Sequence, residues 1–279
     1  MSPKTGMLQP RAFAALLLCM LSLRAQDPRE IVRQSVSKDM RNWPLARNYT
    51  YIEKTTVNDL DKHGQVKKTT TETAEVVMLC GAPYRRVTER QGVQLSGKAE
   101  QKQYERVDKL SAEDSKDCAK RQEAVERRQR KQREFLQDIP DAFTFRLLGI
   151  EKVDGKDAYA IAAEPRPGYR SPDGRGKFLS KIHGKIWIDK AELQWIKVDA
   201  ETIDTVSPGL FLFRLNKGAS LQFEQARVND EIWLPRHIHV MGTGRVALLV
   251  SGGNSADIRY DNYKKFSADS RVISTSEVK

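Results

Sequence analysis

The second half of the chain alternates between apolar and polar residues from residue 143 to residue 266. This period of two is typical of β-strands, in which successive side chains point to opposite faces. Clusters of Gly, Pro, Asn and Asp separate the runs and predict turns. We therefore expect strands at residues 143–150, 158–164, 185–189, 194–201, 210–215, 221–228, 232–241 and 258–266, with turns at Asn229-Asp230 and Gly252-Gly253-Asn254.

Two different periods follow one another in the first half of the chain. Apolar residues three and four apart predict an amphipathic helix over residues 28–40, with Asp27 as its cap and Pro44 beyond its end. A period of two then predicts strands at residues 49–57, 66–79 and 84–89. In all, about ten strands joined mainly by tight turns predict one antiparallel sheet, curled into a sandwich or a barrel.

Residues 96–137 form a charged segment that contains few apolar residues and no proline. A thin apolar stripe at Tyr104, Val107 and Leu110, with Ser111 as the cap of a second helix, predicts two mostly solvated helices joined near Leu110. Such a segment is either a solvated insert or a basic surface that contacts a partner or an anionic membrane.

Residues 1–25 match the pattern of a signal peptide. Lys4 and Arg11 precede an apolar run of about ten residues, which is too short to span a bilayer, and Ala25 offers a small residue for cleavage. The chain has no other apolar run of this kind, which excludes a multi-pass membrane protein. We expect an exported protein in which residues 26–279 form a single domain. An uncleaved anchor or a buried N-terminal helix is the alternative interpretation.

Export changes how the charge and the cysteines are interpreted. The chain has a formal net charge of +11, which would suit nucleic acid or an anionic membrane, and export argues against nucleic acid as a partner. An oxidising compartment permits disulfides. Cys80 and Cys118 are the cysteines that remain beyond the leader, so they are the candidate disulfide, with two unpaired thiols as the alternative.

Candidate catalytic chemistry is sparse. His237 and His239 stand two apart in a predicted strand, so their imidazoles share one face in a spacing that a metal site can use. No carboxylate or cysteine lies nearby in the sequence, and the Gly-rich segment at residues 174–177 lacks the spacing of a phosphate loop. We therefore predict no enzyme activity and no cofactor. A metal-dependent hydrolase that uses the two histidines is the less favoured alternative.

Aromatic residues follow the alternation of the predicted sheet. Phe143 and Phe145 share a face, whereas Trp187 lies between Ile186 and Ile188, which point to the opposite face. A curled sheet can line its concave face with such residues, and it can equally bury them in an ordinary core sealed by helices.

Four segments carry a family resemblance, namely residues 184–190, residues 194–198, Trp233-Leu234-Pro235 and residues 260–266. Through these segments the chain resembles exported relatives of the outer-membrane lipoprotein-sorting family of Gram-negative bacteria. The resemblance is strongest over residues 143–270. The charged segment departs from the classical carriers. The resemblance implies an α+β, mainly β fold: a curled antiparallel sheet that stays unclosed (a LolA/LolB-like half-barrel), with helices over its open side and a charged helical insert at residues 96–137.

The resemblance also implies a function. In that family the sheet wraps an apolar cavity that receives acyl chains, so we expect a periplasmic protein that binds lipid acyl chains or a lipoprotein, for transport or sorting to the outer membrane. The residues expected to line the cavity are Tyr49, Tyr51, Phe143, Phe145, Trp187, Trp195, Phe211, Phe213, Phe223 and Trp233.

Basic residues between residues 165 and 181 suit the anionic head groups of a membrane surface. The candidates for this contact are Arg170, Arg175, Lys177 and Lys181. The main alternative function is an envelope interaction or sensor module with a filled core, in which the insert at residues 96–137 binds a protein partner.

Overall fold

The computed structural model describes residues 27–61, 63–79, 82–112, 115–172, 174–206, 213–246 and 250–265. The predicted signal peptide, residues 1–25, lies outside this part of the chain. No helix in these ranges is long and apolar enough to cross a membrane.

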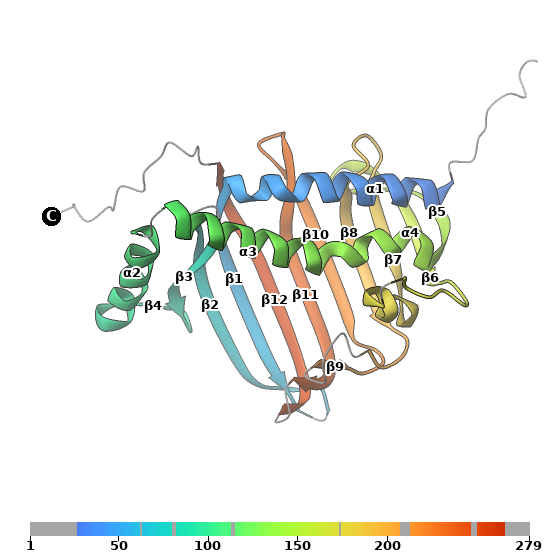
Figure 1. Cartoon of the computed structure of the whole chain (residues 1–279). Coiled ribbons are helices and arrows are strands. Elements are labelled where there is room, and N and C mark those ends of the chain that lie inside the picture. Colours follow the sequence, from blue (N-terminus) through green and yellow to red (C-terminus); the bar gives the residue numbers. More distant parts are fainter. Residues whose placement is uncertain are drawn as a thin grey trace, which may run out of the picture.

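One curved antiparallel sheet dominates the molecule (Figure 1). Its strand order is β4-β3-β2-β1-β12-β11-β10-β8-β7-β6-β5, and the short β9 pairs with β11. Within the described ranges the edge strands β4 and β5 do not pair, so the prediction of an unclosed antiparallel sheet is confirmed. The strands are β1 Tyr49–Leu60, β2 Val66–Leu79, β3 Ala82–Arg90, β4 Val93–Gln94, β5 Phe143–Val153, β6 Lys156–Pro165, β7 Ile182–Asp189, β8 Trp195–Thr202, β9 Phe213–Leu215, β10 Ser220–Val228, β11 Ile232–Val246 and β12 Val250–Lys265.

Helices cover one face of this sheet, as predicted (Figure 1). The chain leaves β4 at one edge of the sheet and enters β5 at the other edge, so the segment between them has to cross its whole width. The charged segment makes this crossing, and α3 therefore lies over the sheet beside α1. The helical elements are α1 Pro28–Asn42, η1 Trp43–Asn48, α2 Gly97–Ser111, α3 Ser115–Arg133, η2 Glu134–Asp138, α4 Ile139–Ala142 and η3 Arg175–Lys181.

Helix α1 begins where its sequence predicts. The Asp27 carboxylate accepts a hydrogen bond of 2.9 Å from the backbone N–H of Arg29, which satisfies one of the free donors of the first turn. Its apolar stripe, which includes Ile31, Val32 and Val36, is buried against the sheet and contributes to the largest core cluster.

Alternation along the strands separates two faces. The covered face, which lies under the helices, carries Ile186 and Ile188 of β7 in the largest core cluster. The outer face carries Trp187, which packs with Ile196 and Trp233 in a separate cluster. Both faces of the central strands are therefore apolar in places, which is why periodicity alone does not identify the face that binds a ligand.

One predicted turn is wrong. Gly252, Gly253 and Asn254 lie inside β12, where they pair with residues of β11, and Gly253 and Asn254 also pair with β1. A Cβ on Gly253 would stand 3.0 Å from the Cβ of Leu60 on β1. These glycines therefore allow neighbouring strands to approach closely, and the chain does not reverse there. By contrast, the chain does turn at Asn229 and Asp230, which both have positive φ, but the connection between β10 and β11 includes Glu231 as a third residue, because Val228 pairs with Ile232.

Candidate ligand-binding site

An apolar cavity lies between the covered face of the sheet and the short helices η2, α4 and η3. Its volume is about 310 Å³, which falls within the usual range for small-molecule sites. The side chains that enclose it are mostly apolar and come from sheet and helices alike: Phe135, Leu136, Ile139, Phe143, Ala163, Phe178, Leu179, Ile182, Ile186, Trp195, Val198, Leu221 and Phe223.

The sheet side of this cavity follows directly from strand register. Ile186 of β7 is paired with Val198 of β8, and Val198 is paired with Phe223 of β10. Residues that are directly opposite in neighbouring strands point to the same face. Three neighbouring strands of the sheet therefore present a continuous apolar floor to the cavity. Trp195, which pairs with Ile188, extends this floor.

The other wall is formed by aromatic side chains from helices. Phe135 of η2 and Phe178 of η3 meet edge to face, with their ring centroids 5.1 Å apart. Ser171 anchors this region, because its hydroxyl accepts a hydrogen bond from the backbone N–H of Gly176 and donates one to Asp138. The Gly-rich loop thus has a structural role, which is to hold η3 over the cavity.

Four residues that line this cavity have a buried polar atom without a hydrogen-bond partner among the described residues. The donors are the indole N–H of Trp195 and the Nε–H of Arg133, and the acceptors are the amide oxygen of Gln225 and one carboxylate oxygen of Asp199. A buried polar group without a hydrogen bond costs about 1–3 kcal/mol. The walls of this cavity therefore hold polar groups whose hydrogen-bonding capacity is unused.

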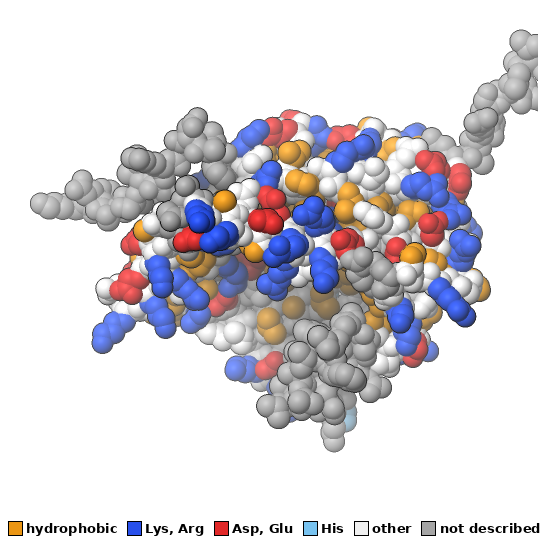
Figure 2. All heavy atoms as spheres, in the orientation of Figure 1, with side chains coloured by type: hydrophobic (Ala, Val, Ile, Leu, Met, Phe, Trp, Pro, Cys, Tyr) orange, Lys and Arg blue, Asp and Glu red, His pale blue; other side chains and the backbone are white. Residues whose placement is uncertain are grey.

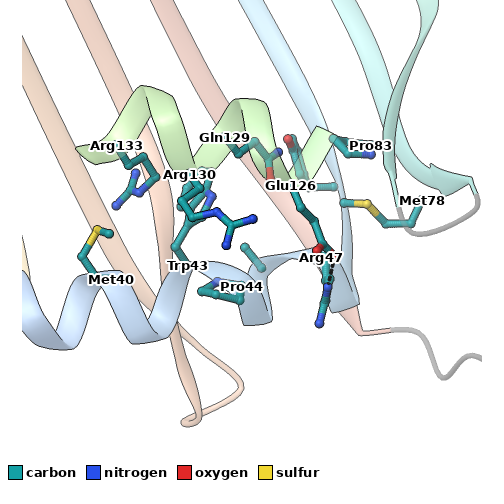
Figure 3. Close-up of a pocket in the computed structure, with 12 residues that line it drawn as sticks. Met40, Trp43, Pro44, Arg47, Met78, Pro83, Glu126, Gln129, Arg130 and Arg133 are labelled. Atoms are coloured by element: carbon teal, nitrogen blue, oxygen red, sulfur yellow. Dashed lines mark hydrogen bonds and ion pairs between the residues drawn. The ribbon is translucent and has the colours of Figure 1, made fainter. Parts of the chain in front are cut away.

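A second cavity, of about 370 Å³, lies between α1, η1, α3 and strands β1, β2 and β3 (Figure 3). We call it the arginine cavity, because Arg47, Arg130 and Arg133 line it and Glu126 is the one carboxylate among its lining residues. The rest of its wall is mainly apolar: Met40, Trp43, Pro44, Ala46, Tyr51, Met78 and Pro83, with Gln129.

Two ion pairs attach α3 to the N-terminal helices around this cavity. Arg47 of η1 pairs with Glu126 of α3 (Figure 3). Arg133 pairs with Asp39 of α1, and its guanidinium lies 4.2 Å from the ring centroid of Trp43. Helix α3 is therefore attached to the rest of the molecule as a cover of the sheet, while its described side chains remain exposed or half-buried, as expected for a mostly solvated helix.

Three half-buried tyrosines form a cluster that reaches the arginine cavity through Tyr51. The ring of Tyr51 is 5.7 Å from that of Tyr260 and 5.2 Å from that of Tyr263. Burial and the nearby charge of Glu53 raise the pKa of Tyr51 to about 12. Burial also raises the pKa of Tyr260 and of Tyr263. The folded state therefore holds these phenolic protons more tightly than the unfolded chain does.

We expect this cluster to make stability depend on alkaline pH. A tyrosine in the unfolded chain has a pKa of about 10. The cluster's contribution to the free energy of unfolding is therefore fully present below pH 10. It is lost as the pH rises towards about 12, because the unfolded state then binds fewer protons than the folded state. Urea unfolding between pH 8 and pH 11 measures this slope. Tyr51→Phe should flatten it, whereas Tyr104→Phe, at an exposed site on α2, should not; equal slopes would contradict the prediction.

The structure distributes the expected cavity residues among several environments. Phe143, Trp195 and Phe223 line the apolar cavity, and Tyr51 lines the arginine cavity. Phe145 packs against the core near Phe143, with the ring centroids 6.1 Å apart. Tyr49 is a fully buried core residue whose hydroxyl donates to Glu231. Phe211 and the side chain of Phe213 lie outside the described residues.

Two of the expected cavity residues lie on the outer face of the sheet. Trp187 and Trp233 belong to the outer cluster, away from both cavities. The ring of Trp187 lies beneath the ammonium groups of Lys185 and Lys197, and its N–H donates to Glu151. Because side chains alternate along β7, placing Ile186 and Ile188 on the covered face forces Trp187 outward.

The predicted basic loop contributes less free charge than its sequence implies. Lys181 pairs with Asp204 at 2.9 Å and donates to the carbonyl oxygen of Thr205. Arg170 and Lys177 are exposed, and the side chain of Arg175 lies outside the described residues. Figure 2 shows that Lys and Arg side chains also gather over the helices that cross the sheet.

The paired histidines have a structural partner. His237 Nε2 lies 2.6 Å from a carboxylate oxygen of Asp257, and His239 Nδ1 lies 3.5 Å from the same oxygen. Burial opposes ionisation of Asp257, but its hydrogen bonds with His237 and Arg259 outweigh this, so its pKa lies below the usual value. Within the described ranges no group of three or more His, Cys, Asp or Glu side chains is arranged to hold a metal ion.

Cys118 is disulfide-bonded. Its predicted partner, Cys80, lies outside the described residues.

Three solved structures are similar to this chain at low identity. A DUF1329 family protein from Desulfovibrio piger is 14% identical, with 88% of this chain and 96% of that chain covered and a TM-score of 0.36. An outer membrane lipoprotein-sorting protein domain from Vibrio parahaemolyticus is 11% identical (85% and 94% covered, TM-score 0.30). A LolA superfamily protein from Nitrosomonas europaea is also 11% identical (84% and 94% covered, TM-score 0.29).

A scan against family models and a search of curated proteins found no match.

Several residues of the two cavities are absent from the sequence-based prediction. Arg47, Arg130, Arg133, Phe135 and Phe178 all come from helical segments that cover the sheet. A signal for part of this set exists in the sequence: Glu126, Arg130 and Arg133 are spaced four and three apart, which places them on one helix face. Nothing in that spacing identifies the sheet as what the face covers.

Proposed function

We propose that this protein binds the acyl chain of a lipid or lipoprotein in the apolar cavity, as a binding protein and not as an enzyme. The observation that carries the proposal is the cavity itself: about 310 Å³ with a mainly apolar surface, formed by the sheet and by helices η2, α4 and η3, with polar residues at some positions: Asp39, Arg133, His183, Lys185, Asp199 and Gln225. Transfer of an acyl chain from water into such a site gains about 0.8 kcal/mol for each buried methylene.

Two further features support an acyl chain as the ligand. Phe223 is only half-buried and Leu221 is 39% exposed, although both line the cavity. An apolar surface that remains in contact with solvent gains free energy when a ligand covers it. The apolar floor, which runs across β7, β8 and β10 through Ile186, Val198 and Phe223, also suits an acyl chain better than a polar molecule.

The cellular part of the proposal rests on the leader. Residues 1–25 have the pattern of a secretory signal, so we place the protein in the periplasm of a Gram-negative bacterium. There it would shield an acyl chain from water during transport or sorting towards the outer membrane.

Native mass spectrometry of the full chain, purified from a bacterial periplasm, tests the proposal. We expect a bound species with the mass of a phospholipid or an acylated peptide. The delipidated protein should then take up a fluorescent fatty acid. A mass without bound lipid, together with no uptake of the fluorescent probe, would mean a filled core and would overturn the proposed function.

A further inference from the structure

The charges around the arginine cavity do not balance. Three guanidinium groups line it and one carboxylate, Glu126, faces them. Glu126 is already engaged, because it pairs with Arg47 and accepts a hydrogen bond of 2.9 Å from Gln122. Asp39, which pairs with Arg133, lines the apolar cavity instead.

Two guanidinium groups keep donors available at this place. Arg130 makes no ion pair and no hydrogen bond with any residue of the described part of the chain. Arg133 uses its terminal nitrogen for Asp39, while its Nε is buried without a hydrogen-bond partner there. In Figure 3 both side chains extend from α3 towards Trp43 and Pro44, across the cavity. Donors of this kind favour an anion, since guanidinium groups bind carboxylates and phosphates through paired hydrogen bonds.

The arginine cavity and the apolar cavity adjoin one another. Arg133 lines both of them, and its ion pair with Asp39 lies at their junction. The arginine cavity therefore supplies positive charge that no carboxylate balances, and the apolar cavity beside it supplies a nonpolar surface. A molecule with a charged head and one long chain would satisfy both at once.

We infer that the arginine cavity binds the anionic head group of the same amphiphile whose chain occupies the apolar cavity. The ligand class is then an amphiphile with a phosphate or carboxylate head and at least one acyl chain, and Arg130 is the residue that selects the charge. This inference rests on the proposed function, because it assigns the second half of the same ligand.

Calorimetric titration of the full chain with two ligands of equal chain length tests the inference. The probes are dodecyl phosphate and dodecanol, with inorganic phosphate alone as a third. We expect dodecyl phosphate to bind about tenfold more tightly than dodecanol, which corresponds to one charge-assisted hydrogen bond at a partly exposed site. Inorganic phosphate should bind far more weakly than dodecyl phosphate.

Matched variants on α3 locate the selectivity. Arg130→Gln should remove most of the preference for the anionic probe while dodecanol still binds. Arg128→Gln makes the same charge change at another exposed residue of the same helix, one that lines neither cavity, and should leave the preference intact. If both variants lose the preference for dodecyl phosphate equally, the preference comes from the overall positive charge of the surface, such as a surface that contacts a membrane. That result would overturn the assignment to Arg130.

The remaining outcomes separate the inference from the proposed function. Equal binding of the two dodecyl compounds by the unaltered protein would overturn the inference and leave acyl-chain binding standing. Binding of inorganic phosphate as tight as that of dodecyl phosphate would indicate a site for free phosphate, which also overturns it. If neither dodecyl compound binds, the proposed function fails and the inference fails with it.

Discussion

Replacing Phe223 with glutamate is expected to abolish acyl-chain binding, with a loss of affinity for a fluorescent fatty acid of about a hundredfold or more. Phe223 lies on the apolar floor opposite Val198. A carboxylate at this position has to lose its hydration when a chain covers it, and desolvation of an unpaired charge costs several kcal/mol. The half-buried position lets the side chain reach solvent in the empty protein, so the fold should survive.

The neighbouring residue offers a matched control for this prediction. Gln222 is exposed on the opposite face of β10, so Gln222→Glu introduces the same charge into the same strand without entering the cavity. It should bind the probe as the unaltered protein does, and Phe223→Leu should retain most of the affinity. Unchanged binding by Phe223→Glu, with the fold intact by circular dichroism, would place the ligand elsewhere.

Replacing Arg133 with methionine is expected to destabilise the protein by about 3–5 kcal/mol, the usual cost of removing one partner of a buried ion pair. The side chain of Asp39 is only 6% exposed, and Arg133 is its ion-pair partner. Methionine keeps the apolar stem over Trp43 but leaves the carboxylate buried without a counter-charge. For a domain of this size the melting temperature should fall by about 10 °C.

A second substitution identifies the cause of that loss. Asp39→Asn, added to Arg133→Met, removes the unpaired charge and should restore a large part of the stability. Arg128→Met, at an exposed position of the same helix, should change the melting temperature little. If the Arg133→Met variant has the same melting temperature as the unaltered protein, the ion pair does not hold α3 to α1.

Local chemistry in the sequence is sufficient to predict most of the elements. Asp27 and Pro28 begin α1 as expected, and the charged segment contains two helices, Gly97–Ser111 and Ser115–Arg133, joined close to Leu110. The strand Val66–Leu79 has its predicted bounds. These features depend on capping, helical propensity and side-chain alternation, which act between residues that are close in sequence.

Long-range features are harder to predict because they depend on which strands become neighbours. The pairing of β1 with β12 joins segments about 200 residues apart along the chain, which no local pattern specifies. Once β4 and β5 lie at opposite edges, the charged segment has to cross the sheet, and this turns α3 into a cover that brings Arg130 and Arg133 to the site.

The sequence by itself determined most of the strands and helices and the two alternating faces of the sheet, because these follow from the period of apolar residues along the chain. Only the tertiary structure decided which face the helices cover and where the cavities lie. It placed Trp195 and Phe223 under the helices and Trp187 and Trp233 on the outer side. The physical reason is that alternation fixes the side chains relative to one another, whereas the position of the covering helices decides which of the two faces is enclosed.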